Sequence, residues 1–526
     1  MDGDILVPFS PEAVLSGVNR QLKPEEYLWY KRRLPDEVKP EKGSRWILHF
    51  GAVDQCAVVY INGKKQGKHV GGYLPFSYDI TEALKEEKNL LTVKVRDYSE
   101  TCYYSRGKQK LKNGGMFYTA QSGIWQTVWI EKVPECYIGH LKITPLYDQS
   151  SIMIQMEEEH GIKDIDYEVT ITARKMWPVK ASGKTGKPCV IMIPHMRRWS
   201  PEDPFLYDLH VRMGEDSVES YFAMRKVEVK NDKEGIPRIF LNNEPYFEKG
   251  VLDQGYWPDG LYTPPCDEAM IYDIQKMKDL GFNMIRKHIK IEPQRWYYHC
   301  DRIGMLVWQD MMNGGESYSP LSIYVFSNLG LRVKDDRYRY FSRSDEAGRT
   351  HYYEELGQMI DLLYNTVSLA LWVPFNEGWG QFDAKQITRL VRKLDPTRLI
   401  DHASGWHDQG VSDVKSLHVY FKPYRFKPDK KGRAVVLSEF GGYNLPVAGH
   451  TWNAKNFGYK GYQTPEALGE AVKTLYETQI VPACKSGLAA DVYTQLSDVE
   501  DEVNGFVTYD RRVEKLPEAL MQAIAR

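Results

Sequence analysis

Apolar and polar residues alternate along the first quarter of the chain, which is the pattern of β-strands with one buried face. The alternation is clearest in residues 45–63, which end at Asn62-Gly63, a pair that favours a tight hairpin turn. The same period recurs in three further segments, residues 71–81, 89–99 and 123–133. Residues 1–137 are therefore predicted to form an antiparallel β-sandwich of the jelly-roll kind.

The next part of the chain, residues 138–230, is also predicted to be all β. Strand-like segments separated by turn residues occupy residues 140–148, 151–159, 166–175, 207–214 and 220–230. The spacing and the length of the region, about 90 residues, are typical of an immunoglobulin-like β-sandwich.

After Gly235 the period changes, and short apolar segments alternate with amphipathic helical ones. The strand-like segments are residues 246–252, 283–289, 306–311, 369–377, 399–404, 416–421, 434–440 and 492–499. Eight strands in about 290 residues predict a (β/α)₈ barrel, a TIM barrel, over residues 231–526 with a terminal helix. The fold class is thus multidomain: a jelly roll, an immunoglobulin-like sandwich and a barrel.

Two glutamates end predicted barrel strands. Glu377 ends the fourth, in LALWVPFNEGWG, and Glu439 ends the seventh, in AVVLSEFGG. Barrel active sites lie at the carboxyl ends of the strands, so both side chains can reach one pocket. Two carboxylates are the minimum for cleaving a glycosidic bond: one protonates the leaving oxygen and, about 5–5.5 Å away in a retaining enzyme, the other attacks the sugar.

Other polar and aromatic residues near these strand ends are candidates for substrate binding. The amide of Asn376 could bind the sugar 2-hydroxyl, and His418 and Tyr420 could donate to the nucleophile. Candidates for the walls of the sugar pocket are Trp308, Trp379 and Trp406. The alternatives are a solvated surface acid for each glutamate, a satisfied core histidine for His418, and ordinary packing for the tryptophans.

Composition narrows the class of function. A net charge of -2 argues against a nucleic-acid partner, and no apolar stretch approaches the roughly 20 residues of a membrane span. Seven cysteines without a C-x-x-C pair, and no export signal at the start of the chain, favour a cytoplasmic protein without zinc. A periplasmic or secreted protein remains the alternative if the N-terminus is truncated. No cofactor is predicted, and a homo-oligomer stays open.

The motifs together resemble those of glycoside hydrolase family 2, the β-galactosidase, β-glucuronidase and β-mannosidase family. The resemblance spans nearly the whole chain and rests on SGIWQTVWIE, WSPEDPFLYDL, DIQKMKDLGFNMIRKHI, FNEGWG, LSEFGG and NGFVTYDRR, in that order. It implies a retaining mechanism with Glu377 as acid/base and Glu439 as nucleophile. Asn376 carries over as the residue before the acid, and Tyr420 as a partner of the nucleophile.

The chain also departs from the family pattern. Where the large β-galactosidases have magnesium ligands after the third strand, it reads MMNGGE, so no active-site metal is predicted. It lacks the Asn-x-Lys pair that grips a carboxylate after the eighth strand, which disfavours a β-glucuronidase. Arg286 and His288, at the end of the second strand, and Asp310, near the end of the third, are predicted to contact substrate hydroxyls. The first domain looks short at its N-terminus.

The function predicted from these features is an exo-acting retaining glycoside hydrolase of the β-galactosidase type, with a carbohydrate as its partner. Exo action is inferred from the expected pocket shape and from residues 311–343, which are predicted to cover the pocket as a partial lid. The alternative for this segment is a surface excursion that packs against another domain. The alternatives are a β-glucuronidase, a β-mannosidase, a furanosidase acting on galactofuranose or arabinofuranose, or a non-catalytic carbohydrate-binding protein.

Overall fold

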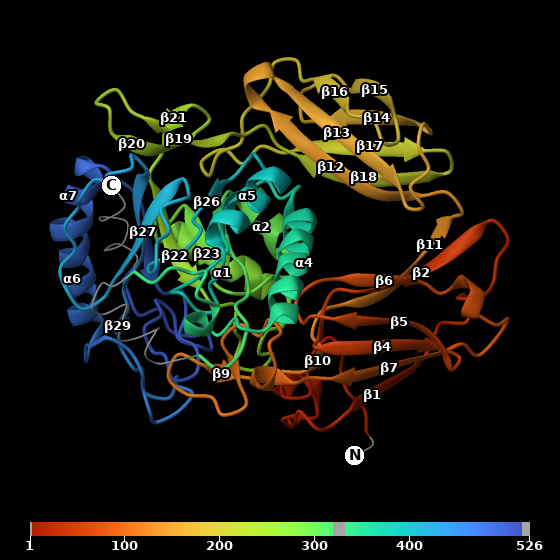
Figure 1. The fold of residues 1–526 in the computed structure, drawn as a ribbon, viewed down its shortest axis with the longest axis horizontal. Helices are drawn as coiled ribbons and strands as arrows, with labels where there is room; N and C mark the ends of the chain where they lie inside the picture. The colour runs from red at the N-terminus through yellow and green to blue at the C-terminus, as the bar shows by residue number, and fades with distance from the viewer. Residues whose placement is uncertain (1–2, 319–331, 518–526) are drawn as a thin grey trace.

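The computed structural model describes residues 3–318 and 332–517. Three bodies follow one another along the chain in Figure 1: a red to orange β-sandwich, an orange to yellow-green one, and a green to blue barrel surrounded by helices. This confirms the predicted fold class. The terminal helix and the middle of the predicted lid, residues 518–526 and 319–331, lie outside the described residues.

The first domain is a sandwich of two main antiparallel sheets. Its sheets have the orders β1 (Leu28–Arg33), β7 (Leu90–Arg96), β4 (Cys56–Ile61), β5 (Lys64–Val70) and β11 (Val128–Pro134), β2 (Ser44–Phe50), β6 (Phe76–Asp79). Apolar residues at alternate positions, such as Val59 and Val93, fill the space between the sheets. Asn62 and Gly63 form the predicted two-residue turn between β4 and β5, both with positive φ, as a tight hairpin requires.

The second domain packs a three-stranded sheet on a four-stranded one. The orders are β12 (Ile138–Leu146), β13 (Ser151–Glu158), β16 (Cys189–Met192) and β15 (Val179–Lys184), β14 (Asp166–Thr172), β17 (Tyr207–Met213), β18 (Asp216–Phe222). The predicted strand 220–230 is in fact two strands. After β18 the chain turns, and β19 (Val227–Asn231) pairs with β20 (Pro237–Leu241), whose residues pack under the barrel strands.

All eight predicted barrel strands are present, and every described pairing between them is parallel. Around the barrel they are β26 (Leu399–Ile400), β25 (Leu369–Val373), β24 (Leu306–Asp310), β23 (Met284–Lys287), β22 (Glu248–Asp253), β31 (Leu488–Thr494), β28 (Ala434–Gly441) and β27 (Val414–Val419). Strand β31 begins earlier than predicted, because the buried Asp491 interrupts its apolar run.

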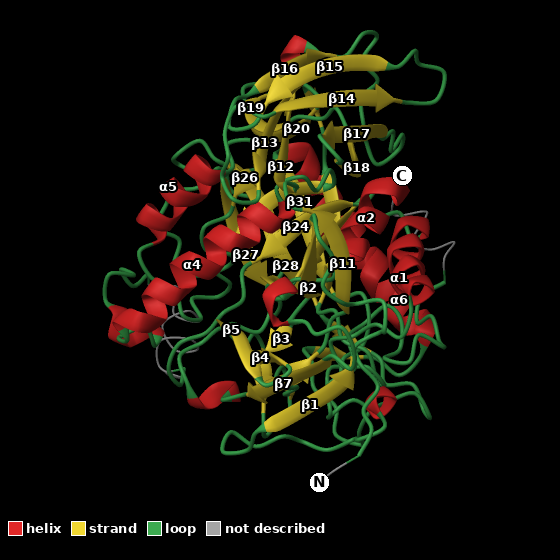
Figure 2. Ribbon diagram, turned by 90° about the vertical axis from the view of Figure 1, so that its right-hand side faces the viewer, coloured by secondary structure: helices red, strands yellow, loops and turns green. Residues whose placement is uncertain are grey.

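The helices cover the outside of the barrel, as Figure 2 shows. They are α1 (Asp267–Asp279), α2 (Gln294–Ile303), α4 (Glu346–Leu363), α5 (Ala384–Leu394), α6 (Pro465–Leu475) and α7 (Val481–Ser486). Side-chain caps begin two of them: Asp345 accepts from the Gly348 amide at 2.7 Å, and Thr464 accepts from the Ala467 amide at 3.2 Å. Within residues 3–318 and 332–517 no helix combines the length and apolar character that crossing a bilayer requires.

At one place the barrel is closed by polar contacts rather than by a pairing of neighbouring strands. Strands β26 and β27 are the two ends of the sheet order, and polar groups join them there. The Ser416 hydroxyl donates to Asp401 at 2.8 Å, and the Ile400 amide donates to the Asp413 carboxylate at 2.9 Å. No helix lies between these two strands, as the sequence predicted.

Candidate active site

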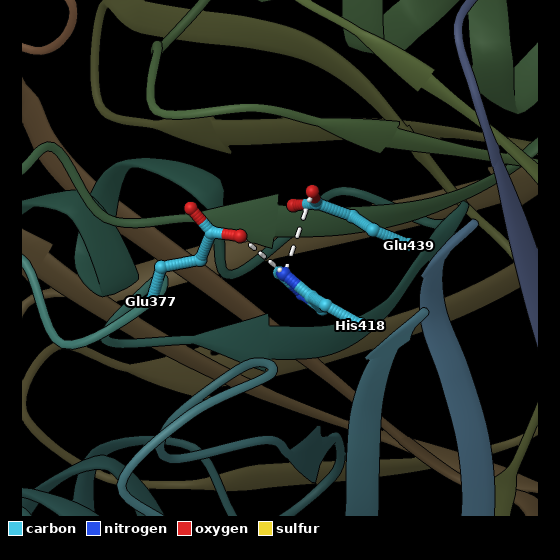
Figure 3. A group of neighbouring side chains, drawn as sticks. All are labelled: Glu377, His418 and Glu439. Carbon is cyan, nitrogen blue, oxygen red and sulfur yellow. Dashed lines mark hydrogen bonds and ion pairs between the residues drawn. The ribbon is translucent and has the colours of Figure 1, made fainter. Parts of the chain in front are cut away.

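The two predicted glutamates meet at the carboxyl end of the barrel. Glu377 follows β25, Glu439 lies near the end of β28, and His418 on β27 lies between them (Figure 3). One oxygen of each carboxylate and Nδ1 of His418 all lie within 4.8 Å of one another. The strand ends therefore bring together residues that lie far apart in the sequence.

Backbone geometry sets the direction of Glu377. Its φ is +51°, a left-handed conformation that costs a non-glycine residue about 1–3 kcal/mol. The neighbouring strand holds it there, because the Glu377 amide donates to the Ser404 carbonyl at 2.9 Å. The side chain is 11% exposed and lines the pocket. Strain of this kind, held by the surrounding structure, is common at catalytic positions.

Glu439 is buried among hydrogen-bond donors. The Tyr420 hydroxyl donates to its Oε2 at 2.5 Å, and Nη1 of Arg286 donates to its Oε1 at 3.1 Å. Burial alone would raise the pKa of Glu439, but the His418 and Arg286 charges and the Tyr420 hydrogen bond together lower it to about 2. Glu439 is therefore ionised over the whole physiological pH range, as a nucleophile must be.

Arg286 organises the floor of the site. It pairs with Asp310 through two hydrogen bonds of 2.9 Å each, and it also donates to Glu439, to the Ser438 carbonyl and, at 2.9 Å, to Oδ1 of Asn376. These five bonds use all five guanidinium hydrogens. Because Arg286 fixes the Asn376 carbonyl, the amide NH₂ of Asn376 points elsewhere; this buried nitrogen has no hydrogen-bond partner. It remains free to bind a sugar hydroxyl.

His418 contacts both carboxylates through one nitrogen. Its Nδ1 lies 2.7 Å from Oε1 of Glu377 and 3.4 Å from Oε2 of Glu439. Its other ring nitrogen, Nε2, lies 3.0 Å from the Ser404 hydroxyl. The sequence placed His418 beside the nucleophile, whereas its shortest contact is to Glu377.

The pocket above the glutamates is small and polar. Besides predicted residues it is lined by Lys108, Met116, Leu252, Gln254, Tyr459, Thr494 and Glu502. Its cavity volume is about 20 Å³, room for about one water molecule. A sugar ring therefore requires flexible side chains of the lining, such as those of Lys108 and Met116, to shift. Tyr459 stacks on Tyr420 with ring centroids 4.0 Å apart and forms part of the wall.

Lys108 comes from the jelly roll. It is 8% exposed, and no carboxylate of residues 3–318 or 332–517 lies within ion-pairing distance of its ammonium group. The loop that carries it is fixed to the barrel: the amides of Arg106 and Gly107 both donate to the Asn313 carbonyl, and the Arg106 guanidinium donates to the Gly315 carbonyl at 2.5 Å. The first domain thus completes the pocket wall.

Several predicted binding residues lie behind the pocket rather than in its wall. Arg286 and Asp310 are completely buried and support Glu439 and Asn376, so they are not placed to contact hydroxyls directly. Trp308 is also completely buried and donates to Glu248 at 2.6 Å in the barrel floor, which is the packing alternative. Side chains alternate in direction along a strand, and the sequence did not reveal which of these side chains reach the pocket wall.

Of the remaining predicted residues, His288 is among those that line the pocket, whereas Trp379 and Trp406 are not. His288 lines the pocket and contacts Asp310 at 2.7 Å; burial, helped by the charges of Lys108 and Arg286, lowers its pKa well below the usual range, so it is neutral. Trp379 is buried and stacks against Phe117, with ring centroids 5.5 Å apart. Trp406 is half-buried, 6.3 Å from the His418 ring.

Glu377, His418 and Glu439 are also the one group of three or more potential metal ligands found among the described residues. Their ligand atoms are close enough for a cation. However, the Arg286 guanidinium already compensates the charge of Glu439, and Nδ1 of His418 and Oε1 of Glu377 are only 2.7 Å apart, shorter than the spacing of two ligands around a metal such as zinc. The contacts favour a shared proton over a cation at this position.

The class of protein that this fold and site define is a multidomain barrel protein, with two β-sandwiches before a parallel barrel and paired carboxylates at its carboxyl end. The chain belongs to glycosyl hydrolases family 2. Models of that family match its sugar binding domain at residues 19–134, a further family 2 domain at residues 136–225, and the TIM barrel domain at residues 266–513.

The relatives carry two activities in their names. A beta-galactosidase of Thermoanaerobacter pseudethanolicus is 25% identical over 74% of this chain, and the dog beta-glucuronidase is 23% identical over 80% of it. The chain spans about half the length of the curated relatives it matches. The solved beta-D-glucuronidase of Dictyoglomus thermophilum has a TM-score of 0.76 at 18% identity, covering 99% of this chain and 93% of its own, a similarity that concerns the fold.

Proposed function

We propose that this protein is an exo-acting, retaining glycoside hydrolase in which Glu377 is the acid/base and Glu439 the nucleophile. The observation that carries the proposal is the distance between the carboxylates, with one oxygen of each within 4.8 Å. Retaining enzymes hold the two groups about 5–5.5 Å apart, whereas inverting enzymes leave about 6.5–9.5 Å for a water molecule. The low pKa of Glu439 supports its role as nucleophile.

The mechanism follows from the contacts. Glu439 attacks the anomeric carbon and forms a covalent glycosyl-enzyme while Glu377 protonates the leaving oxygen; water then attacks, with Glu377 as base. Asn376 lines the pocket with a free amide nitrogen, and we propose that it binds the 2-hydroxyl, where a hydrogen bond strengthens as positive charge develops. A non-catalytic carbohydrate-binding protein would not need a nucleophile kept ionised in a buried site.

The identity of the substrate sugar is the more specific part of the proposal. We propose a β-galactoside as the first candidate, since the pocket lacks the Asn-x-Lys pair of β-glucuronidases. Two observations favour a β-glucuronide as the second: the ammonium of Lys108 in the pocket wall, and the beta-glucuronidase names among the relatives. Seven free cysteines suit a reducing compartment, which supports a cytoplasmic location.

The proposal is tested with a panel of nitrophenyl glycosides covering β-galactosides, β-glucuronides, β-mannosides and the two furanosides, followed by NMR of the first sugar released. We expect turnover on one β-glycoside and a product that first appears as the β-anomer. A product of inverted configuration, or no turnover on any member, would exclude the proposed function. Lys108→Met decides between the two leading sugars, because it should reduce uronide hydrolysis by about tenfold or more and galactoside hydrolysis much less.

A further inference from the structure

The hydrogen bonds around His418 define where its protons lie. The Ser404 hydroxyl donates to the Ser438 hydroxyl at 2.9 Å, and the Ser438 hydroxyl donates to the Leu417 carbonyl at 3.3 Å. A hydroxyl has one hydrogen, so Ser404 can only accept from Nε2 of His418, 3.0 Å away. Nε2 therefore carries a hydrogen, and Nδ1 is the nitrogen that faces a proton donor or acceptor on Glu377.

That nitrogen faces Glu377. With 2.7 Å between Nδ1 and Oε1, the pair has one proton between two strong acceptors. The proton is on the carboxyl group when the imidazole is neutral, and on the imidazole when the carboxylate is charged. Because the His418 side chain is 1% exposed, bulk water does not supply this proton directly.

We propose that Glu377 and His418 form a single acid/base unit, in which the proton shared by Nδ1 and Oε1 is the one given to the leaving group. His418 is thus a positioning residue that acts through Glu377. This inference rests on the proposed function and adds to it the origin of the catalytic proton.

The proton and bond changes balance in both steps. In the first, the proton leaves the Glu377 carboxyl for the leaving oxygen, the bond from C1 to that oxygen breaks, and Glu439 bonds to C1; the pair becomes carboxylate and neutral imidazole. In the second, water gives a proton to Glu377 and its oxygen bonds to C1, while the bond between C1 and Glu439 breaks. The pair then has its proton again.

The position of Nδ1 also balances charge. It lies 3.4 Å from Oε2 of Glu439, and the His418 charge contributes to keeping that carboxylate ionised. When Glu439 loses its charge by bonding to the sugar, the pair loses its proton in the same step. Both changes are reversed when water releases the sugar. The buried site therefore does not accumulate net charge during either step, which matters where charge is costly.

The test compares His418→Gln with wild type on two glycosides of the same sugar, one with a 2,4-dinitrophenyl and one with a methyl leaving group. Only the methyl glycoside needs a proton on its leaving oxygen, so kcat/KM should fall about 100-fold or more there and less than about tenfold on the activated substrate. Sodium azide, which needs no base, should restore turnover of the activated substrate. Glu377→Ala should show the same pattern, and the double variant should be no worse than Glu377→Ala alone.

The matched control is His402→Gln, a buried histidine at the end of β26 that touches neither carboxylate. It should leave the ratio of the two substrates unchanged. Thermal unfolding establishes that each variant is folded, and His418→Asn replaces His418→Gln if the latter is not. Equal losses on both substrates, no effect of azide, or losses that add to those of Glu377→Ala would overturn the proposal. Absence of wild-type turnover on every glycoside would overturn the proposed function as well.

Discussion

A buried carboxylate stays ionised only when the surrounding donors replace the water it has lost, and Glu439 depends on such donors. Burial acts against its charge, while Arg286, His418 and Tyr420 act for it. Arg286 comes from β23, whereas His418 and Tyr420 come from the end of β27. The low pKa is therefore a property of the assembled barrel, and each donor can be tested separately.

Tyr420→Phe removes one of these donors with little change in shape. Because the hydroxyl stabilises the charged form of Glu439, its loss should raise the pKa of Glu439 from about 2 and move the acid limb of kcat/KM to higher pH. A hydrogen bond to a charged group contributes about 1.5–3 kcal/mol, so at neutral pH we expect a loss of about tenfold or more. The measurement is the pH profile on an activated aryl glycoside.

Tyr424→Phe is the control for this change, since the Tyr424 hydroxyl has no hydrogen-bond partner and lies on the segment after β27. It should leave the profile in place. An acid limb that stays where it is in Tyr420→Phe would mean that this hydroxyl does not stabilise the ionised nucleophile.

At the level of single residues, one rule was enough to predict part of the site: functional residues of a barrel lie where its strands end. Glu377, Glu439, His418 and Tyr420 follow apolar runs, and that position is visible without a structure. The same rule could have found Thr494, at the end of β31, and Glu502 in the loop after it. It could not have found Lys108, because nothing local in the jelly-roll sequence indicates that its loop packs on the barrel.

At the level of elements, the seam between β26 and β27 is the weak point of the barrel. Asp401 accepts from Ser416 there through one oxygen, while its other oxygen is buried without a partner. Burial raises its pKa to about 6, despite the Ser416 hydrogen bond and the charge of Arg286. The sequence predicted both strands, but it did not reveal that polar side chains join them, because β26 comprises only two residues.

Asp401→Asn should therefore stabilise the protein at high pH. The folded pKa lies above the unfolded value of about 3.9, so the wild-type contribution is complete below pH 4 and is lost as pH rises through 6. Asparagine keeps the acceptor for Ser416 and never ionises. We expect up to about 3 kcal/mol of added stability at pH 8 and no gain at pH 4.

Thermal or denaturant unfolding at the two pH values measures this difference. Asp413→Asn, at the same seam, is the matched control: it weakens two bonds to Arg392 and should not gain stability at high pH. Equal effects of Asp401→Asn at pH 4 and pH 8 would show that ionisation of Asp401 does not weaken the seam.

At the level of the whole molecule, the active site depends on the contact between the first domain and the barrel. The jelly-roll loop that carries Lys108 bonds to residues that follow β24, and Tyr118 of the same domain donates to Glu502 in the pocket wall. These contacts join residues far apart in the sequence, which is why pattern analysis predicted three domains but not a pocket shared by two of them.

Arg106→Ala tests this dependence. Arg106 donates to the carbonyls of Cys102, Gly315 and Glu316, so its loss should release the loop and misplace Lys108. We expect kcat/KM to fall about tenfold on a uronide and much less on a galactoside, mainly through KM, because binding rather than chemistry is impaired. Since Arg106 is expected to act only through the position of Lys108, Arg106→Ala combined with Lys108→Met should be no worse than the more damaging of the two single variants. Additive losses would mean that the loop supports the pocket in some other way, and an unchanged KM in both single variants would mean that the first domain does not contribute to sugar binding.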